Sequence, residues 1–295
     1  MNNLKKIGLT ALAGSLVAGS VSAAELSASG SATMTFTGGD ENANHGNGWT
    51  MADSVTFSAS GDVNDIGVTL SLELDGDAQS QKVDPAAASA TATGSNVLDS
   101  HSISLDFGDA GTLTFAGHGG SGFMDANDDV MPTASEEPWD VVTGADAGVI
   151  NGFSGDNMFT YKYSHESGLN LTLSYINASD AVTDVSYSDA GVTYTGMDGL
   201  TIGYGQGDVE NVTNSKSNES TLFAKYAMGS VTVGIQKSEK DVESGTDTES
   251  TGIGISYAVN DDLTISYGSN TREKVGSKDQ EAVAIGASYT MGSLT

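Results

Sequence analysis

A long acidic segment is the part of this sequence whose residue types most clearly suggest chemistry. Residues 119–152 contain no Lys or Arg and seven acids, which are Asp125, Asp128, Asp129, Glu136, Glu137, Asp140 and Asp146. Carboxylates gathered at a narrow point attract cations and repel anions. The segment therefore predicts a cation-selecting pore constriction if it folds inward. As a solvated outer loop, the same acids would have no specific role.

If the segment folds into a barrel, charged side chains on the strands opposite it would line the same lumen. Lys162 and Lys225 each stand between apolar or aromatic neighbours, so strand alternation places both on the polar side of their strands. The acids Glu73 and Asp106 fall on the polar phase of two earlier strands. We expect these four residues to line the lumen wall, where two cations against seven loop acids favour cation selectivity.

Other chemistries find little support in the sequence. The runs Asp125–Asp129 and Asp75–Asp77 have oxygen ligands at spacings that suggest Ca²⁺, but neither completes an EF-hand loop. Loop calcium therefore stays open as a hypothesis, and we predict no other cofactor. The four histidines show no metal-ligand spacing, and neither a nucleophile elbow nor a phosphate-binding loop is found. The prediction is that the protein is not an enzyme.

The N-terminus has the three parts of a secretory signal peptide. Lys5 and Lys6 precede an uncharged run, and small residues follow up to Ala24. We expect residues 1–23 to be removed. The alternative, an N-terminal membrane anchor, fits less well because the run is shorter than a spanning helix and rich in Gly and Ser.

Composition then narrows the class of the mature chain. The absence of cysteine excludes a disulfide scaffold and a cysteine-ligated zinc site. Without Lys5 and Lys6, 9 basic residues stand against 39 acidic ones, a net charge of −30. Such a surface repels nucleic acid and attracts cations. High acidity can also indicate disorder, but regular apolar alternation argues against that interpretation.

Fourteen β-strands can be assigned from alternation. In residues 168–177, Leu169, Leu171 and Leu173 alternate with Asn170 and Thr172. Most segments have the length of a tilted membrane-crossing strand. The predicted strands are 26–37, 50–61, 66–76, 98–107, 111–118, 153–165, 168–177, 184–196, 199–209, 219–229, 230–241, 250–260, 262–272 and 282–291. In 184–196 the apolar phase slips near Asp189-Ala190-Gly191, which predicts either a β-bulge there or a wrong assignment.

The connections decide between a soluble sandwich and a membrane barrel, which alternation alone cannot separate. Short and long connections alternate along the chain. This alternation is what a membrane barrel requires, with tight turns on one side of the membrane and loops on the other. Tyrosines recur near strand ends, as an interfacial girdle requires, and charges gather in the long connections. With the N-terminus in the periplasm, every long connection falls on the outer side.

At this point the chain resembles the general outer-membrane porins of Gram-negative bacteria, which are trimeric and 16-stranded. The resemblance rests on the signal peptide, the Ala24-Glu25-Leu26 start, the hairpin Tyr-x-Met-Gly-Ser-(Val/Leu)-Thr at 226–232 and 289–295, and the longest loop between the fifth and sixth strands. It implies an all-β, up-and-down antiparallel transmembrane β-barrel over residues 24–295, with loop 119–152 folded inward. The last two strands are expected to be missing after Thr295; a complete 14-stranded barrel is the alternative.

The resulting prediction is a passive, cation-selective diffusion channel in the outer membrane. Its expected partners are outer-membrane lipid, small hydrophilic solutes, inorganic cations and two further copies of the chain in a homotrimer, with no nucleic acid. The first alternative is a plugged barrel with a structural or adhesive role, which would pass no current. The second is a soluble secreted β-solenoid or adhesin, whose turns would recur at one constant spacing.

Overall fold

The chain folds as an all-β protein. In the computed structural model, residues 25–36, 49–76, 98–134, 154–177, 185–211, 215–243 and 245–290 are described. Fourteen strands form an antiparallel sheet in chain order, and two short ones pair separately as β6 with β7. No helix among these residues is long and apolar enough to cross a bilayer. The fold-class prediction is thus confirmed, with every one of the fourteen predicted segments containing a strand.

The strand bounds follow the predicted ranges closely. The first strands are β1 Glu25–Phe36, β2 Trp49–Val63, β3 Ile66–Gly76, β4 Leu98–Asp106 and β5 Thr112–His118, followed by the short β6 Gly120–Ser121 and β7 Ser154–Gly155. The later ones are β8 Met158–Ser164, β9 Leu169–Ile176, β10 Val185–Tyr194, β11 Leu200–Asn211, β12 Ser215–Met228, β13 Val231–Val242, β14 Thr248–Ala258, β15 Leu263–Lys274 and β16 Gln280–Tyr289. Two 3₁₀ turns, η1 Gly108–Ala110 and η2 Asp125–Asn127, complete the set.

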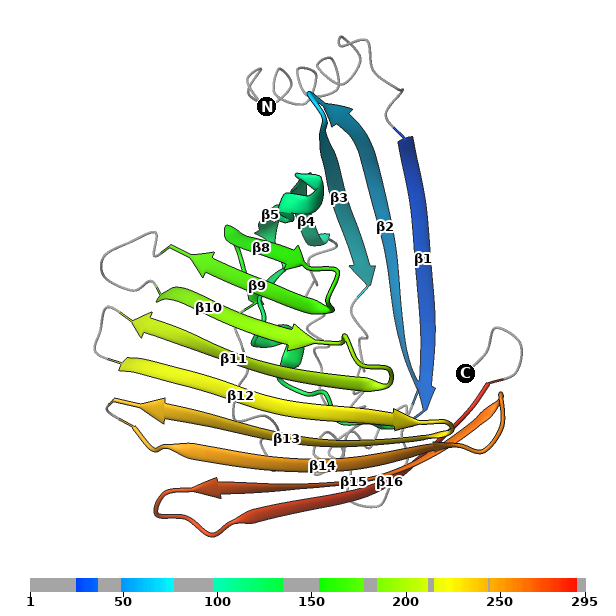
Figure 1. The fold of residues 1–295 in the computed structure, drawn as a ribbon, viewed down its shortest axis with the longest axis vertical. Coiled ribbons are helices and arrows are strands. Elements are labelled where there is room, and N and C mark those ends of the chain that lie inside the picture. The colour runs from blue at the N-terminus through cyan, green and yellow to red at the C-terminus, as the bar shows by residue number, and fades with distance from the viewer. Residues whose placement is uncertain are drawn as a thin grey trace, which may run out of the picture. The chain divides into compact units, whose positions relative to one another are not determined.

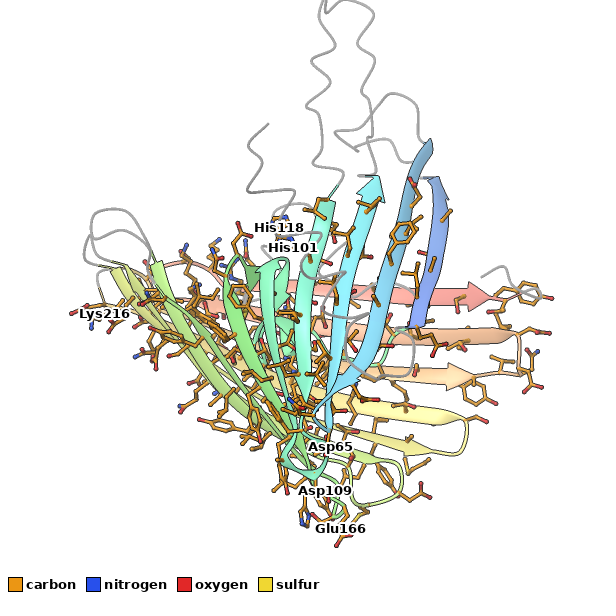
Figure 2. The ribbon with its side chains drawn as sticks, turned by 90° about the horizontal axis from the view of Figure 1, so that it is seen from above. Asp65, His101, Asp109, His118, Glu166 and Lys216 are labelled. Carbon is orange, nitrogen blue, oxygen red and sulfur yellow. The ribbon has the colours of Figure 1, made fainter. Side chains whose placement is uncertain are left out.

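The described chain divides into two compact units. The first comprises residues 1–108 and 114–119, and the second residues 109–113 and 120–295. In the first unit, β1 to β4 pair as consecutive antiparallel neighbours. Its β2–β3 turn places Asn64 and Asp65 at φ 52° and 63°, the left-handed conformation that a two-residue hairpin needs and that Asn and Asp tolerate. Asp65 lies at one end of this unit, while His101 and His118 lie toward the other (Figure 2).

In the second unit, β8 to β16 lie side by side in chain order (Figure 1). Short turns join them at one end; Gly199 in one of these turns has φ 72°, and any Cβ there would lie 2.4 Å from the Ala227 carbonyl oxygen. Asp109 and Glu166 mark the short-turn end, and Lys216 the opposite end (Figure 2). Within this unit, the predicted separation of short turns from long connections is therefore present.

The two faces of the sheet in the second unit differ in chemistry and in exposure. Leu222 and Ile235 are 53% and 52% exposed, whereas their immediate chain neighbours Thr221 and Gln236 are 0% and 5% exposed. We call these the apolar face and the polar face. A soluble sandwich would bury its apolar face. Here the apolar side chains are exposed and the polar ones are covered. This is the arrangement of a sheet whose apolar face meets lipid.

Strand β10 corrects one prediction. Its register against β9 and β11 is continuous, so the expected β-bulge at Asp189-Ala190-Gly191 is wrong. The apolar phase slips because Tyr187 lies on the polar face, where it is 1% exposed and packs with Met158 and Ile176. A register shift in the β3–β4 ladder lies between Glu73 and Leu74 of β3.

Candidate functional site

A segment between β5 and β8 lies against the polar face of β10 to β14. We call residues 120–134 the docked segment. At its start, β6 pairs with β7, and the Thr160 hydroxyl donates a hydrogen bond to the Ser121 carbonyl at 3.4 Å. Phe123 and Met124 are 3% and 0% exposed. The segment is therefore packed onto the sheet by its own apolar side chains.

Glycines make room for these side chains. We call Gly191, Gly205, Gly207, Gly234 and Gly254 the glycine seat. A Cβ at Gly191 would lie 2.1 Å from Phe123 Cγ, and one at Gly205 would lie 2.3 Å from Phe123 Cδ1. One at Gly254 would lie 3.0 Å from Pro132 Cδ. Larger residues would occupy the space that the docked segment fills, so the seat requires residues without side chains.

A single amide on β13 fastens the middle of the docked segment. Gln236 Nε2 lies 2.8 Å from the Asn127 carbonyl, 3.1 Å from the Asp128 carbonyl and 3.0 Å from the Thr221 hydroxyl. The Val130 N–H donates to Gln236 Oε1 at 3.1 Å. The carbonyls need the NH₂ and the N–H needs the oxygen, so the contacts fix which way the amide points.

A carboxylate on β10 holds the start of η2. Asp189 is 5% exposed, and its Oδ2 accepts the Met124 N–H and the Tyr187 hydroxyl, both at 3.0 Å. Its Oδ1 has no partner among the described atoms. Asp125 and Glu219 are further charged groups that interact with Tyr187. The acidic groups thus continue from the docked segment onto the strands beneath it.

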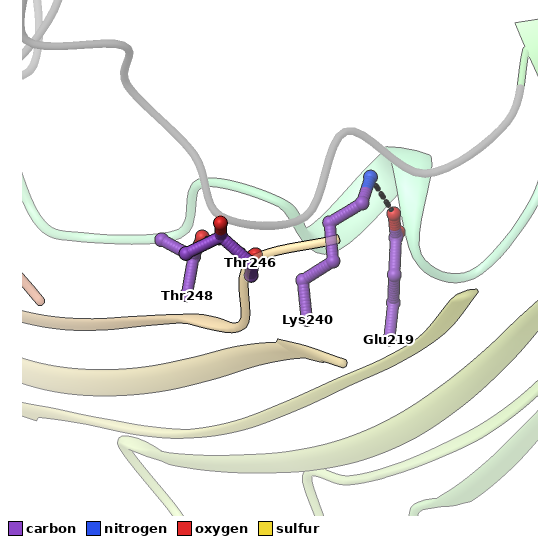
Figure 3. Close-up of polar contacts among 4 residues, drawn as sticks. All are labelled: Glu219, Lys240, Thr246 and Thr248. Atoms are coloured by element: carbon purple, nitrogen blue, oxygen red, sulfur yellow. Dashed lines mark hydrogen bonds and ion pairs between the residues drawn. The ribbon is translucent and has the colours of Figure 1, made fainter. Parts of the chain in front are cut away.

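One ion pair crosses the polar face next to this region. Lys240 Nζ lies 2.5 Å from Glu219 Oε1, between directly paired positions of β12 and β13 (Figure 3). The Glu219 side chain is 1% exposed and that of Lys240 is 31% exposed. Because a covered carboxylate is costly without a partner, Lys240 compensates Glu219 rather than offering a free positive charge.

The predicted constriction acids divide between described and undescribed residues. Asp128 is exposed on the docked segment, and Asp125 and Asp129 are half-buried. The backbone carbonyl of Asp128 is contacted by Gln236, and the residue itself is exposed. The other four predicted acids, Glu136, Glu137, Asp140 and Asp146, lie outside the described residues.

The predicted wall residues are divided between the two units. In the second unit, Lys225 borders the docked segment: a Cβ at Gly234 would lie 3.3 Å from Lys225 Cγ and 2.6 Å from Pro132 Cδ. Lys162 is exposed on β8 and pairs with Thr172, near a short turn.

In the first unit, the two predicted wall acids have local partners. Glu73 accepts a hydrogen bond from the Ser100 hydroxyl at 3.2 Å, on the polar phase of β3 and β4. Asp106 is exposed at the end of β4 and accepts the Gly108 N–H at 2.9 Å. Asp106 therefore caps a turn.

The calcium hypothesis gains no support from the described residues. No group of three or more His, Asp or Glu side chains among them is arranged to hold a metal ion. The described run Asp125–Asp129 forms no such group, and the run Asp75–Asp77 extends past the described residues.

Sequence reasoning missed the residues that hold the docked segment. Asp189, Gln236 and the glycine seat were not among the predicted site residues. One signal was present: Gly203, Gly205 and Gly207 alternate in β11 at positions where other strands carry polar side chains. Alternating glycines on one phase of a strand indicate that another part of the chain approaches closely.

Comparison with known proteins places this arrangement among membrane channels. A family model described as Gram-negative porin matches residues 8–295. No curated protein matches the chain in sequence at a significant level.

Several solved structures share the fold. An anion-selective porin from Comamonas acidovorans is 16% identical with a TM-score of 0.66, covering 91% of this chain and 86% of the other. OmpT of Vibrio cholerae, in its trimer form, is 15% identical with a TM-score of 0.64, covering 92% and 86%. OmpF of Salmonella typhi, in complex with daunomycin, is 13% identical with a TM-score of 0.63, covering 91% and 87%. At these identities the likeness shows a shared fold.

Proposed function

The chain belongs to the Gram-negative porin family, and we propose that it is a passive diffusion channel for small hydrophilic solutes that prefers cations to anions. Family and fold together identify an outer-membrane porin. Porins conduct without chemistry, so we assign the chain no reaction. The predicted plugged barrel is kept only as an outcome of the conductance measurement below.

The charge of the loop carries the cation preference. Residues 119–152 hold seven acids and no Lys or Arg. Asp128 is exposed on the docked segment, and Asp125 and Asp129 are half-buried beside it. Lys240, a cation of the neighbouring strands, is paired with Glu219. This local excess of negative charge supports a potential that concentrates cations and repels anions.

The fold does not determine the sign of selectivity. The Comamonas acidovorans porin has the same fold and is described as anion-selective. Selectivity must therefore come from the charges that each chain places along its pore. For this chain we propose the seven loop acids as the constriction, with Lys162, Lys225, Glu73 and Asp106 on the lumen wall.

Reversal potentials in a KCl gradient test the proposal. A unit charge about 7 Å from an ion contributes about 0.6 kcal/mol in water, and salt near 0.1 M roughly halves this. Each carboxylate then changes the local cation concentration about 1.7-fold. Changing Asp125, Asp128 and Asp129 together to Asn should lower the local cation concentration about fivefold and raise the anion concentration by about the same factor, so the cation-to-anion permeability ratio should fall about 20-fold.

A charge-matched control separates the effect of the loop acids on selectivity from the effect of the protein's net charge. Replacing three exposed short-turn acids by Asn removes the same charge far from the proposed constriction, and it should leave the ratio nearly unchanged; these acids are Asp109, Asp198 and Asp261. An anion-selective wild type would contradict the selectivity, and a wild type without current would favour the plugged barrel.

The remaining expectations are also proposals. We propose a signal peptide at residues 1–23, a barrel domain over 24–295 with loop 119–152 folded inward, and no cofactor. We further propose a homotrimer, supported by the trimer form of the Vibrio cholerae relative. Migration of unheated and heated protein on a detergent gel, with mass measurement in detergent, tests the oligomeric state.

A further inference from the structure

A polar groove lies across β9 to β12, at the end of the second unit that Lys216 marks, opposite the short turns (Figure 2). Its volume is about 460 Å³, within the range of small-ligand sites. Cross-strand pairing places its residues in register: Ser188 pairs with Tyr175 and with Asp208, and Asp208 pairs with Asn218. We call it the edge groove; its lining includes Tyr175, Ser188, Asp208, Glu210, Lys216 and Asn218.

The edge groove continues the surface that meets lipid. On β11, Tyr204 is 43% exposed on the apolar face. The next residues of the same phase, Gln206, Asp208 and Glu210, are all polar and exposed. Asp208 lies four residues beyond Tyr204, about 13 Å along the strand and about 10 Å along the membrane normal at a tilt near 40°. The groove therefore begins where the apolar rows end, which is the level of lipid headgroups.

The edge groove holds charges of both signs. Lys216 Nζ lies 2.6 Å from Glu210 Oε1, and these side chains are 59% and 60% exposed. Asp208 also interacts electrostatically with Lys216. Two carboxylates thus accompany one ammonium, which leaves a negative charge that attracts a cationic group. Tyr175, 48% exposed at the end of the row, adds an aromatic ring that can bind a cation on its face.

We propose that the edge groove binds a lipid headgroup that carries both an ammonium group and a phosphate group. The ammonium binds to Asp208 beside the Tyr175 ring, and the phosphate accepts hydrogen bonds from Lys216. The acyl chains then lie along the apolar rows that end at Tyr204. A free zwitterion would meet the same charges but would bury no acyl chain, so the surface favours a lipid. This inference goes beyond the proposed channel function, since lipid binding needs no conduction.

Native mass spectrometry of the full chain in detergent tests the groove with three lipids that share the same acyl chains. Phosphatidylglycerol has a phosphate but no ammonium, so phosphatidylethanolamine should be retained about two- to fivefold more, the range of one exposed charge pair. Phosphatidylcholine should fall between them, because its methylated ammonium donates no hydrogen bond to Asp208. Equal retention of the three lipids would overturn the proposal. Displacement by an equal concentration of free phosphoethanolamine would overturn the assignment to a lipid.

Two variants separate the halves of the headgroup. Asp208→Asn should lower retention of phosphatidylethanolamine about two- to fivefold without lowering that of phosphatidylglycerol, whereas Lys216→Met should lower both. Glu273→Gln and Lys237→Met remove the same charges from the same face of β15 and β13, outside the groove, and should change neither.

Folding and conduction are measured on the same samples. Migration of unheated protein on a detergent gel confirms that each exposed-site variant is folded. Equal losses in the groove variants and in their controls would contradict the site. A wild type that passes no current but still prefers phosphatidylethanolamine refutes only the channel function, and a conducting wild type without lipid preference refutes only the edge groove.

Discussion

The apolar face of β14 allows a quantitative test of which side of the sheet meets lipid. Ile253 is 46% exposed on this face, and Glu249 and Tyr257 lie four residues away on either side. Four residues span about 13 Å along a strand, or about 10 Å along the membrane normal at a tilt near 40°. Ile253 therefore lies near the middle of an apolar band about 20 Å high, close to the roughly 25 Å typical of outer-membrane barrels.

The perturbation is a single charge placed at this depth. Ile253→Arg should destabilise the folded barrel in lipid by about 2–4 kcal/mol, because a guanidinium near the bilayer midplane has no water to hydrate it. Val259→Arg, on the same face near the short turn, should cost only about 0–1 kcal/mol. Ser256→Arg, on the polar face, should cost less than Ile253→Arg because its side chain can reach water in the lumen.

Urea-induced unfolding from phosphatidylcholine vesicles, followed by the mobility of unheated protein on a detergent gel, measures these free energies. The order Ile253→Arg, then Val259→Arg and Ser256→Arg, is the expected result. If Ser256→Arg were the more damaging change, the polar face would be the one against lipid. The assignment of the two faces would then be refuted.

Two other predictions concern the polar face. Phe123→Ala should reduce the free energy that holds the docked segment on the sheet by about 3–5 kcal/mol, so the backbone amides of residues 123–130 should exchange at least about 100-fold faster. Phe159→Ala on the apolar face is the control. Equal exchange rates in the two variants would contradict the packing of Phe123. Lys240→Met should destabilise the barrel by about 1–3 kcal/mol because it leaves the covered Glu219 carboxylate unpaired. The double variant Lys240→Met/Glu219→Leu should recover most of that loss, and urea unfolding that shows simple additivity would exclude the pair as a coupled unit.

Strands were predictable because their two faces meet different solvents. Leu169, Leu171 and Leu173 alternate with polar residues for a physical reason that period-2 patterns express directly. Tyr187 broke the pattern, since it lies on the polar face and packs with Met158 and Ile176 of β8 and β9 instead of facing lipid. A tertiary contact of this kind resembles a bulge when only local periodicity is considered.

The candidate site was less predictable. Composition identified an acidic segment, but only three of its seven acids lie among the described residues, and Asp128 alone of these is exposed. The residues that hold the segment, Gln236 and Asp189, look like ordinary polar residues of a strand. Their role depends on contacts between residues far apart in the chain, which no spacing rule expresses.

The distance along the chain between clamp and segment has a consequence for biogenesis. Asn127 and Gln236 are 109 residues apart, and Gly254 completes the seat later still. The docked segment is synthesised first, but it cannot pack onto the sheet until β10 to β14 have paired. Contacts of such high sequence separation form late and slowly. Folding must therefore end with the packing of the docked segment, which is synthesised much earlier, onto strands that have already paired.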